Sequence, residues 1–263
     1  MKIQLIRNAT VKIEFAGKIW LVDPFLGDVN SLPPFAGKSS NPVVPLPVSI
    51  SEILNNVDYV LLTHLHPDHF DRKAQEAIPK SMPFIVQPSD FGAIREFGFN
   101  TIEVIDNLKT IDNIKISRVN AQHGEGEILK VMGSVSGYIL EASNEETLYI
   151  TGDTILCDMV ARNLDKFKPD VIICNAGGNV FLPDNNPFRE YISLERVHKV
   201  IMDEKQVFEL LNYKKDTIVI TVHIGALDHE TVTRKSMREY LKNMHVDMKR
   251  VYIPTDGEIV ELY

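Results

Sequence analysis

The chain has 263 residues, 44% of them hydrophobic and 24% charged, which is ordinary for a globular protein with a substantial core. The formal net charge of −8 and the pI of about 5.5 exclude a broadly basic surface of the kind that binds nucleic acid. Two cysteines exclude a disulfide framework, and no apolar run has the length that spans a bilayer.

The chain opens with three short segments in which apolar and polar residues alternate, which predicts antiparallel strands at residues 3–6, 11–15 and 18–22. A turn at Ala16-Gly17 separates the last two. Residues 24–47 then hold six prolines and show no periodicity. A loop of this length is commonly functional or disordered. Its apolar residues favour an ordered loop beside a site, with a plain solvent loop as the equal alternative.

A run of metal-ligating residue types follows the next predicted strand, residues 57–63. The run is His64-Leu65-His66-Pro67-Asp68-His69. Its first two histidines are two residues apart, so their side chains point the same way on an extended segment. The proline forces a turn that sends the aspartate and the last histidine in two further directions. One short segment can therefore serve two neighbouring metal ions, whereas the alternative is a histidine-rich surface turn.

Three later predicted strands are each followed by a further residue of a metal-ligating type. His123 follows the strand at residues 114–119, Asp153 the strand at 147–151, and His223 the strand at 217–222. The carboxyl end of a strand is where α/β proteins place their sites, as for the histidine-rich run. The cysteines, Cys157 and Cys174, are interpreted as small buried hydrophobes, with a ligand role for Cys174 as the alternative.

The remaining pattern alternates between helices and strands, which indicates an α/β chain. Helices are predicted at residues 51–56, 72–78 after a cap at Asp71, 90–97, 155–167, 194–202 after a cap at Ser193, and 231–244. Further strands are predicted at residues 84–87, 101–105, 137–142, 171–175, 251–254 and 259–262. The pair Gly177-Gly178 follows one strand end and either lets the backbone approach the site or forms a plain turn.

The H-x-H-x-D-H run and the ordered residues after it resemble the metallo-β-lactamase superfamily. The resemblance covers nearly the whole chain and implies one domain over residues 1–263, an αββα sandwich of two mixed sheets flanked by helices. It also implies two metal positions that share one bridging carboxylate. Site one would hold His64, His66 and His123, site two would hold Asp68, His69 and His223, and Asp153 would bridge them.

The start of the chain is similar to one branch of this superfamily, which includes ascorbate-6-phosphate lactonase and N-acylphosphatidylethanolamine phospholipase D. The similarity rests on the hairpin at Ala16-Gly17 and the turn Asp23-Pro24-Phe25. In that branch the aspartate matching Asp23 orients a ligand imidazole through its N–H, whereas the alternative is a turn-capping aspartate. The branch shows Gly-His where this chain has Arg7-Asn8, so the role of that histidine is not carried over.

The implied function is that of a dinuclear metal-dependent hydrolase. Imidazole and carboxylate ligands suit zinc, with Mn²⁺, Fe²⁺ and Ni²⁺ as alternatives, and we expect two divalent ions. They would hold a bridging hydroxide that attacks a small ester, lactone or phosphodiester. Asp68 is expected to be essential for catalysis. His229 either lines the site and donates a proton or simply caps the last helix.

Two other functions are compatible with the same ligands. A nuclease is disfavoured by the acidic balance, and a non-catalytic metal-binding regulator by the complete ligand set. A redox function like that of the flavodiiron proteins is disfavoured because that branch carries Glu in place of His66.

We expect a small-molecule substrate, with specificity in residues 25–47 and 179–188, and neither nucleic acid nor membrane as partner. A homo-oligomer is left open. The chain starts without a cleavable apolar segment, so the expected location is the cytoplasm.

Overall fold

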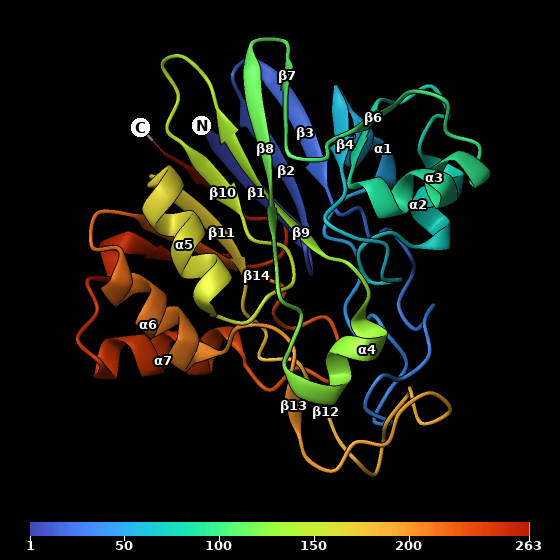
Figure 1. The fold of residues 1–263 in the computed structure, drawn as a ribbon, viewed down its shortest axis with the longest axis vertical. Helices are drawn as coiled ribbons and strands as arrows, with labels where there is room; N and C mark the ends of the chain where they lie inside the picture. The colour runs from blue at the N-terminus through green and yellow to red at the C-terminus, as the bar shows by residue number, and fades with distance from the viewer. Residues whose placement is uncertain (263) are drawn as a thin grey trace.

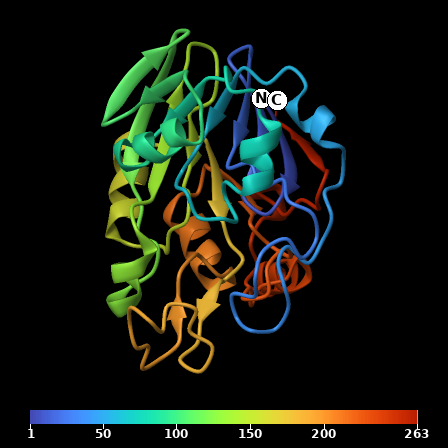
Figure 2. The ribbon, with the colours of Figure 1, turned by 90° about the vertical axis from the view of Figure 1, so that its right-hand side faces the viewer.

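The computed structural model describes residues 1–262, and two seven-stranded sheets form its centre (Figures 1 and 2). Along the chain, the first sheet contains β1 (Lys2–Arg7), β2 (Thr10–Phe15), β3 (Lys18–Val22), β4 (Tyr59–Leu61), β5 (Phe84–Val86), β6 (Ile102–Val104) and β16 (Ile259–Glu261). The second contains β7 (Leu108–Ile111), β8 (Ile114–Asn120), β9 (Ser136–Glu141), β10 (Leu148–Ile150), β11 (Val171–Asn175), β14 (Ile218–Val222) and β15 (Val251–Tyr252).

Both sheets mix antiparallel and parallel neighbours. The first has the order β16-β1-β2-β3-β4-β5-β6, and its strands are parallel from β3 to β6. The second has the order β15-β14-β11-β10-β9-β8-β7, and its strands are parallel from β10 to β15. A separate two-stranded ribbon, β12 (Val180–Phe181) with β13 (His198–Lys199), extends beyond the two sheets at the bottom of Figure 1.

Helices cover the outer face of each sheet. Those on the first sheet are α1 (Ile50–Leu54), α2 (Arg72–Ala77) and α3 (Phe91–Glu96), which lie to the right in Figure 1. Those on the second are α5 (Asp158–Phe167), α6 (Glu204–Tyr213) and α7 (Arg234–Asn243). The short α4 (Leu129–Met132) lies near the ribbon. Within residues 1–262, no helix is long and apolar enough to cross a lipid bilayer.

Strand alternation divides the apolar residues among three layers. In β3, Trp20 and Val22 pack between the sheets, whereas Leu21 packs beneath the helices of the first sheet. In β11, Ile173 faces the other sheet and Ile172 faces the helices of the second. The sequence therefore buries both faces of each sheet, and the predicted αββα sandwich is confirmed.

Most predicted elements lie within a few residues of their observed positions, and the cap at Asp71 is confirmed, since its side chain accepts from the Ala74 N–H. The predicted helix at residues 194–202 is wrong. His198–Lys199 pairs with β12, and the N–H of Val200 donates to the Asn179 carbonyl. These tertiary hydrogen bonds use the backbone groups that a helix would need. The helix α6, the hairpin strand β7 and the ribbon strand β12 were not predicted.

We predict that the two thiols differ sharply in reactivity. Cys174 is buried in β11, and burial raises its pKa to about 12, so at pH 8 it stays a thiol. Cys157 is partly exposed and immediately precedes α5, contrary to its prediction as a buried helical residue. Titration of native protein with a thiol reagent should modify Cys157 alone, and denaturant should release the second group. Rapid modification of native Cys157→Ser protein would contradict this prediction.

Candidate metal centre

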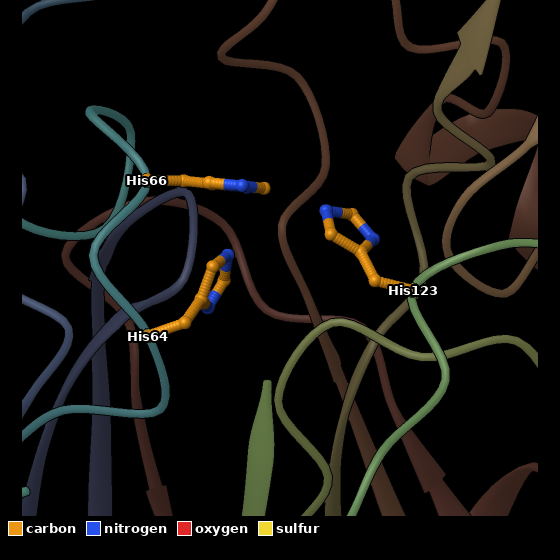
Figure 3. A group of neighbouring side chains, drawn as sticks. All are labelled: His64, His66 and His123. Atoms are coloured by element: carbon orange, nitrogen blue, oxygen red, sulfur yellow. The ribbon is translucent and has the colours of Figure 1, made fainter. Parts of the chain in front are cut away.

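Loops that follow four strands bring the seven predicted ligand residues together. Residues 64–69 follow β4, His123 follows β8, Asp153 follows β10 and His223 follows β14. The ligand atoms form three groups, each with all its atoms within 4.8 Å of one another: His64, His66 and His123; His64, His69 and Asp153; and Asp68, His69 and His223. Figure 3 shows His64 and His66 on one segment and His123 on another, with their rings directed into one space.

The carboxylate of Asp153 lies at the centre of these groups. Its Oδ2 atom is 3.3 Å from Nε2 of His69, 3.3 Å from Nε2 of His123 and 3.9 Å from Nε2 of His64. Its Oδ1 atom is 3.9 Å from Nε2 of His223. Asn175, the last residue of β11, donates to Oδ1 at 2.6 Å. One carboxylate thus faces imidazoles from both predicted metal positions: its Oδ2 atom faces histidines of both, and its Oδ1 atom faces His223.

Asp68 forms the second carboxylate of the centre. Its Oδ2 atom is 3.2 Å from Nε2 of His223 and 3.7 Å from Nε2 of His69. The amide of Asn8 donates to the Asp68 carbonyl at 3.0 Å, and its Nδ2 atom is 3.3 Å from Nε2 of His223. The residue that departs from the branch pattern is therefore buried inside the site.

Asp23 fixes the rings of His69 and His64 through their Nδ1 atoms, directly for His69 and through Thr63 for His64. Its Oδ2 atom is 2.9 Å from Nδ1 of His69 and accepts from the Thr63 hydroxyl at 2.7 Å. The Thr63 oxygen is in turn 3.0 Å from Nδ1 of His64. Because the hydroxyl proton goes to Asp23, this oxygen can only accept, so the Nδ1 atoms of His64 and His69 both carry protons. Their Nε2 atoms are left directed toward Asp153.

His123, another histidine of the predicted site one, is fixed by a backbone carbonyl. Nδ1 of His123 donates to the Val200 carbonyl at 2.8 Å. That carbonyl belongs to the segment predicted as a helix, which instead pairs with β12 and with Asn179. The packing of residues 198–200 is therefore part of the construction of the centre.

Burial and neighbouring charge shift the pKa values in opposite directions across the centre. Burial, with a smaller effect of His123, lowers the pKa of His66 to about 4, and burial with His69 and His66 holds the pKa of His64 well below its usual range. Burial also opposes charge on His223, but Asp153 and Asp68 raise its pKa to about 10. Burial acts to raise the pKa of Asp153, yet the adjacent imidazoles hold it well below its usual range.

These residues fit divalent cations. The Nε2 atoms of His64 and His69 are buried and have no hydrogen-bond partner among residues 1–262. These nitrogens face carboxylate oxygens, so that lone pairs oppose each other across the gap. A cation between them would accept both lone pairs and remove this repulsion. The donors are imidazole nitrogen and carboxylate oxygen, the set that zinc and neighbouring transition metals accept.

A cavity of about 230 Å³ opens directly onto these ligands. Its polar lining consists of His66, Asp68, His123, Asp153 and His229. Its apolar lining consists of Pro33, Pro34, Phe35, Pro67, Met132, Phe181, Pro187 and Phe188. Both segments in which we expected specificity, residues 25–47 and 179–188, contribute to this wall. No lysine or arginine within the described residues 1–262 lines the cavity.

His229 is part of the aromatic wall. Its ring stacks on Phe181 and meets Phe35 edge-on, with ring centroids 5.2 Å apart in both pairs. Its Nε2 atom is 3.1 Å from Nδ2 of Asn179. Burial lowers the pKa of His229 to about 4, so its ring is neutral at neutral pH. It precedes α7 by several residues, so capping that helix is not its task, and Thr233 is the cap instead.

The proline-rich loop is ordered against the cavity. The carboxylate of Asp228 accepts from the backbone N–H groups of Phe35, Ala36 and Lys38, at 2.9 to 3.0 Å, and from the amide of Asn41. Buried Arg7 holds both ends of the same loop, since its guanidinium donates to the carbonyls of Phe25, Gly27 and Val44. The prediction of an ordered loop beside a site is confirmed, and a plain solvent loop is excluded.

The sequence interpretation missed several residues that shape the centre: Thr63, Asn175, Asn179, Asp228 and Glu230. Asn175 ends a central parallel strand, so the rule that located His223 would also have located it. Thr63 directly precedes the histidine-rich run, which is a weaker signal. The other three lie in loops whose contacts depend on tertiary packing.

Comparisons with known proteins are consistent along the whole chain. A family model described as the beta-lactamase superfamily domain matches residues 20–224. The UPF0173 protein YddR of Bacillus subtilis is 31% identical, over 98% of each chain. The structure of a possible metal-dependent hydrolase from Veillonella parvula is 31% identical with a TM-score of 0.91, covering 100% of this chain and 99% of that one. An isothiocyanate hydrolase from Delia radicum gut bacteria is 30% identical with a TM-score of 0.89, with the same coverage.

We predict that Gly177→Ala weakens the fold and the centre together. A Cβ atom at this position would lie 2.2 Å from the His223 carbonyl oxygen, so the backbone approaches the centre as one of the two predictions for Gly177-Gly178 stated. Overpacking of this kind costs about 1–3 kcal/mol. Thermal unfolding should show a lower midpoint temperature, and metal titration should show weaker metal binding.

The matched control is Gly92→Ala. A Cβ atom there meets nothing within 4 Å, and the position lies within α3. Alanine in a helix is favoured over glycine by about 1 kcal/mol, so this variant should be as stable as the wild type or more so. Equal behaviour of the two variants would contradict the prediction for Gly177.

Proposed function

The chain belongs to the metallo-β-lactamase superfamily, and on that premise we propose that it is a hydrolase with two divalent metal ions per chain. The observation that carries this proposal is the position of Asp153, whose two oxygens face imidazoles of two separate ligand groups. Seven ligand residues exceed what one tetrahedral ion can use. Relatives and solved structures described as metal-dependent hydrolases support the same class.

In this proposal His64, His66 and His123 would hold one ion, Asp68, His69 and His223 would hold the other, and Asp153 would contribute its carboxylate to both. Zinc is the metal we expect, with manganese, iron and nickel as alternatives. When bound, such ions supply a water of lowered pKa and a Lewis acid for the substrate.

Side chains of the protein orient the ligand imidazoles and exclude bulk water from the cavity. Asp23 and Thr63 hold His69 and His64 in the tautomer that leaves Nε2 free. Asp68 both belongs to the centre and lines the cavity, so its carboxylate is the group placed to accept a hydrogen bond from the attacking water. The apolar wall excludes bulk water from the substrate.

The cavity favours a small neutral substrate with an apolar group. Its wall is made of proline, phenylalanine and methionine side chains, and no cation from the described residues meets a substrate anion. An ester or lactone fits this lining, whereas a phosphodiester or a nucleic acid would need charge from the ions alone. A cavity of only about 230 Å³ also favours a small molecule over a polymer.

Within this class an isothiocyanate is the substrate we favour. The whole-chain similarity to the isothiocyanate hydrolase gives the specific reason, and the lining suits a neutral electrophilic carbon joined to an apolar group. Water adds to that carbon, the carbon–nitrogen bond breaks, and the products are a primary amine and carbonyl sulfide. His229 would contact the apolar group or the leaving nitrogen from the aromatic wall.

We predict two ions per chain in metal-replete protein and a specific loss at site two in one variant. His223→Ala removes a ligand and should lower the metal content toward one ion per chain. His229→Ala should keep both ions and mainly reduce turnover, because His229 lies in the cavity wall. Elemental analysis after desalting measures the metal content per chain of the wild type and of both variants. One ion or none in active wild-type protein, or metal loss in the His229 variant alone, would overturn the assignment.

Substrate panels test the proposed chemistry. We expect metal-free protein reloaded with Zn²⁺, Mn²⁺ or Fe²⁺ to release amine from an aryl-alkyl isothiocyanate or to hydrolyse an uncharged ester or lactone. Bis(p-nitrophenyl) phosphate and single-stranded RNA should turn over far more slowly. Asp68→Ala should be inactive on every substrate with its secondary structure intact. Turnover confined to the phosphodiester or RNA, or equal turnover without metal, would refute the proposal.

A further inference from the structure

Glu230 is a buried carboxylate close to the centre, but it is not one of the seven candidate ligand residues. It lies in the turn between β14 and α7, and its side chain is 4% exposed. Its Oε2 atom accepts from the backbone N–H groups of Gly225 and Ala226. Its Oε1 atom has no hydrogen-bond partner within residues 1–262.

The unpartnered oxygen of Glu230 faces an unpartnered nitrogen. Nδ1 of His223 is 3.6 Å from Oε1 and is likewise buried without a hydrogen-bond partner in the described part of the chain. A small side-chain rotation that moves Oε1 by a few tenths of an ångström brings the two atoms to hydrogen-bond distance. A buried polar atom left unpaired destabilises the folded state, so pairing of these two atoms is favoured.

The opposite nitrogen of His223 points to the carboxylates of the centre. Nε2 is 3.2 Å from Oδ2 of Asp68 and 3.9 Å from Oδ1 of Asp153. A carboxylate at Nδ1 keeps the proton on that nitrogen, which leaves the Nε2 lone pair free to bind a cation. The two roles fall on the two nitrogens of one ring.

Three other histidines of the centre already have such a partner. His69 has Asp23, His64 has Thr63 and His123 has the Val200 carbonyl. We propose that Glu230 is the corresponding positioning residue for His223, fixing its tautomer and orientation and so raising the affinity of site two for its ion. This inference rests on the proposed two-ion function.

Glu230→Gln tests the proposal with little change of shape. The carboxamide oxygen can still accept from Gly225 and Ala226, while its NH₂ group faces Nδ1 of His223 as a donor. The ring proton is then driven to Nε2, where it competes with the metal. We expect the affinity for the second Zn²⁺, measured by chelator competition on metal-free protein, to fall 10- to 100-fold, with the first ion unaffected.

Asp90→Asn is the matched control. It alters another buried carboxylate, which accepts hydrogen bonds from the side chains of Gln87 and Ser89 and is not among the cavity or ligand residues. Its second-ion affinity should equal that of the wild type. If Glu230→Gln also binds both ions like the wild type, and only its thermal stability falls, the proposal is refuted and Glu230 merely braces its turn.

A measurement on unaltered protein does not depend on how the variant folds. Protein loaded with two Co²⁺ ions should show four slowly exchanging imidazole N–H signals in its paramagnetic proton spectrum, from His64, His69, His123 and His223. His66 is partly exposed and should exchange quickly. Three slow signals would refute the role of Glu230. Wild-type protein that binds only one ion would instead refute the two-ion function, so the two failures are distinguishable.

Discussion

A buried carboxylate among buried imidazoles is the constraint on which this structure depends. Asp153 and Asp68 are held away from water beside His69 and His223. Two anions at this depth are tolerated only with positive charge in contact, and protons on imidazoles or divalent cations both supply it. The fold therefore has to deliver side chains from four loops to one point within a few ångströms. Two sheets packed face to face do so, because the four strands that precede those loops end at one side of the sandwich.

That delivery requires unusual backbone at the ends of the strands. Asn8, Asp23 and His223 all have positive φ, at 57°, 45° and 61°, although none of them is glycine. Conformations of this kind cost about 1–3 kcal/mol each and persist only where the surroundings fix them. Here the surroundings are specific: the His223 N–H donates to the Asn8 carbonyl, and the Asp23 N–H donates to the Leu61 carbonyl. Asn8 and His223 are thus joined to each other and Asp23 is joined to β4, and each residue places a polar side chain at the centre.

The convergence of the candidate ligand residues could be predicted from sequence because each directly follows an apolar strand. The histidine-rich run suggested the superfamily, the resemblance implied the later positions, and the structure brings residues 64–69, His123, Asp153 and His223 together. The two-layer fold was predictable for a similar reason, since strand alternation and helix periodicity are local patterns. The supporting contacts were not predictable, because Val200, Asn179 and Glu230 act through tertiary packing. The segment around Val200 shows why, since its helix-like spacing lost to pairing with β12.

The way Asp228 holds the cavity loop has a consequence for how this protein can diversify. Its carboxylate binds main-chain N–H groups, at Phe35, Ala36 and Lys38, and these groups are supplied by any residue except proline. Side chains of the loop other than Asn41, whose amide also binds Asp228, can therefore be exchanged while the path of the loop and its anchor persist. The ligand loops lie on other segments and are not touched by such exchanges. Substrate preference and metal chemistry are thereby separable, so a lineage can explore new substrates by loop substitution without rebuilding its catalytic centre.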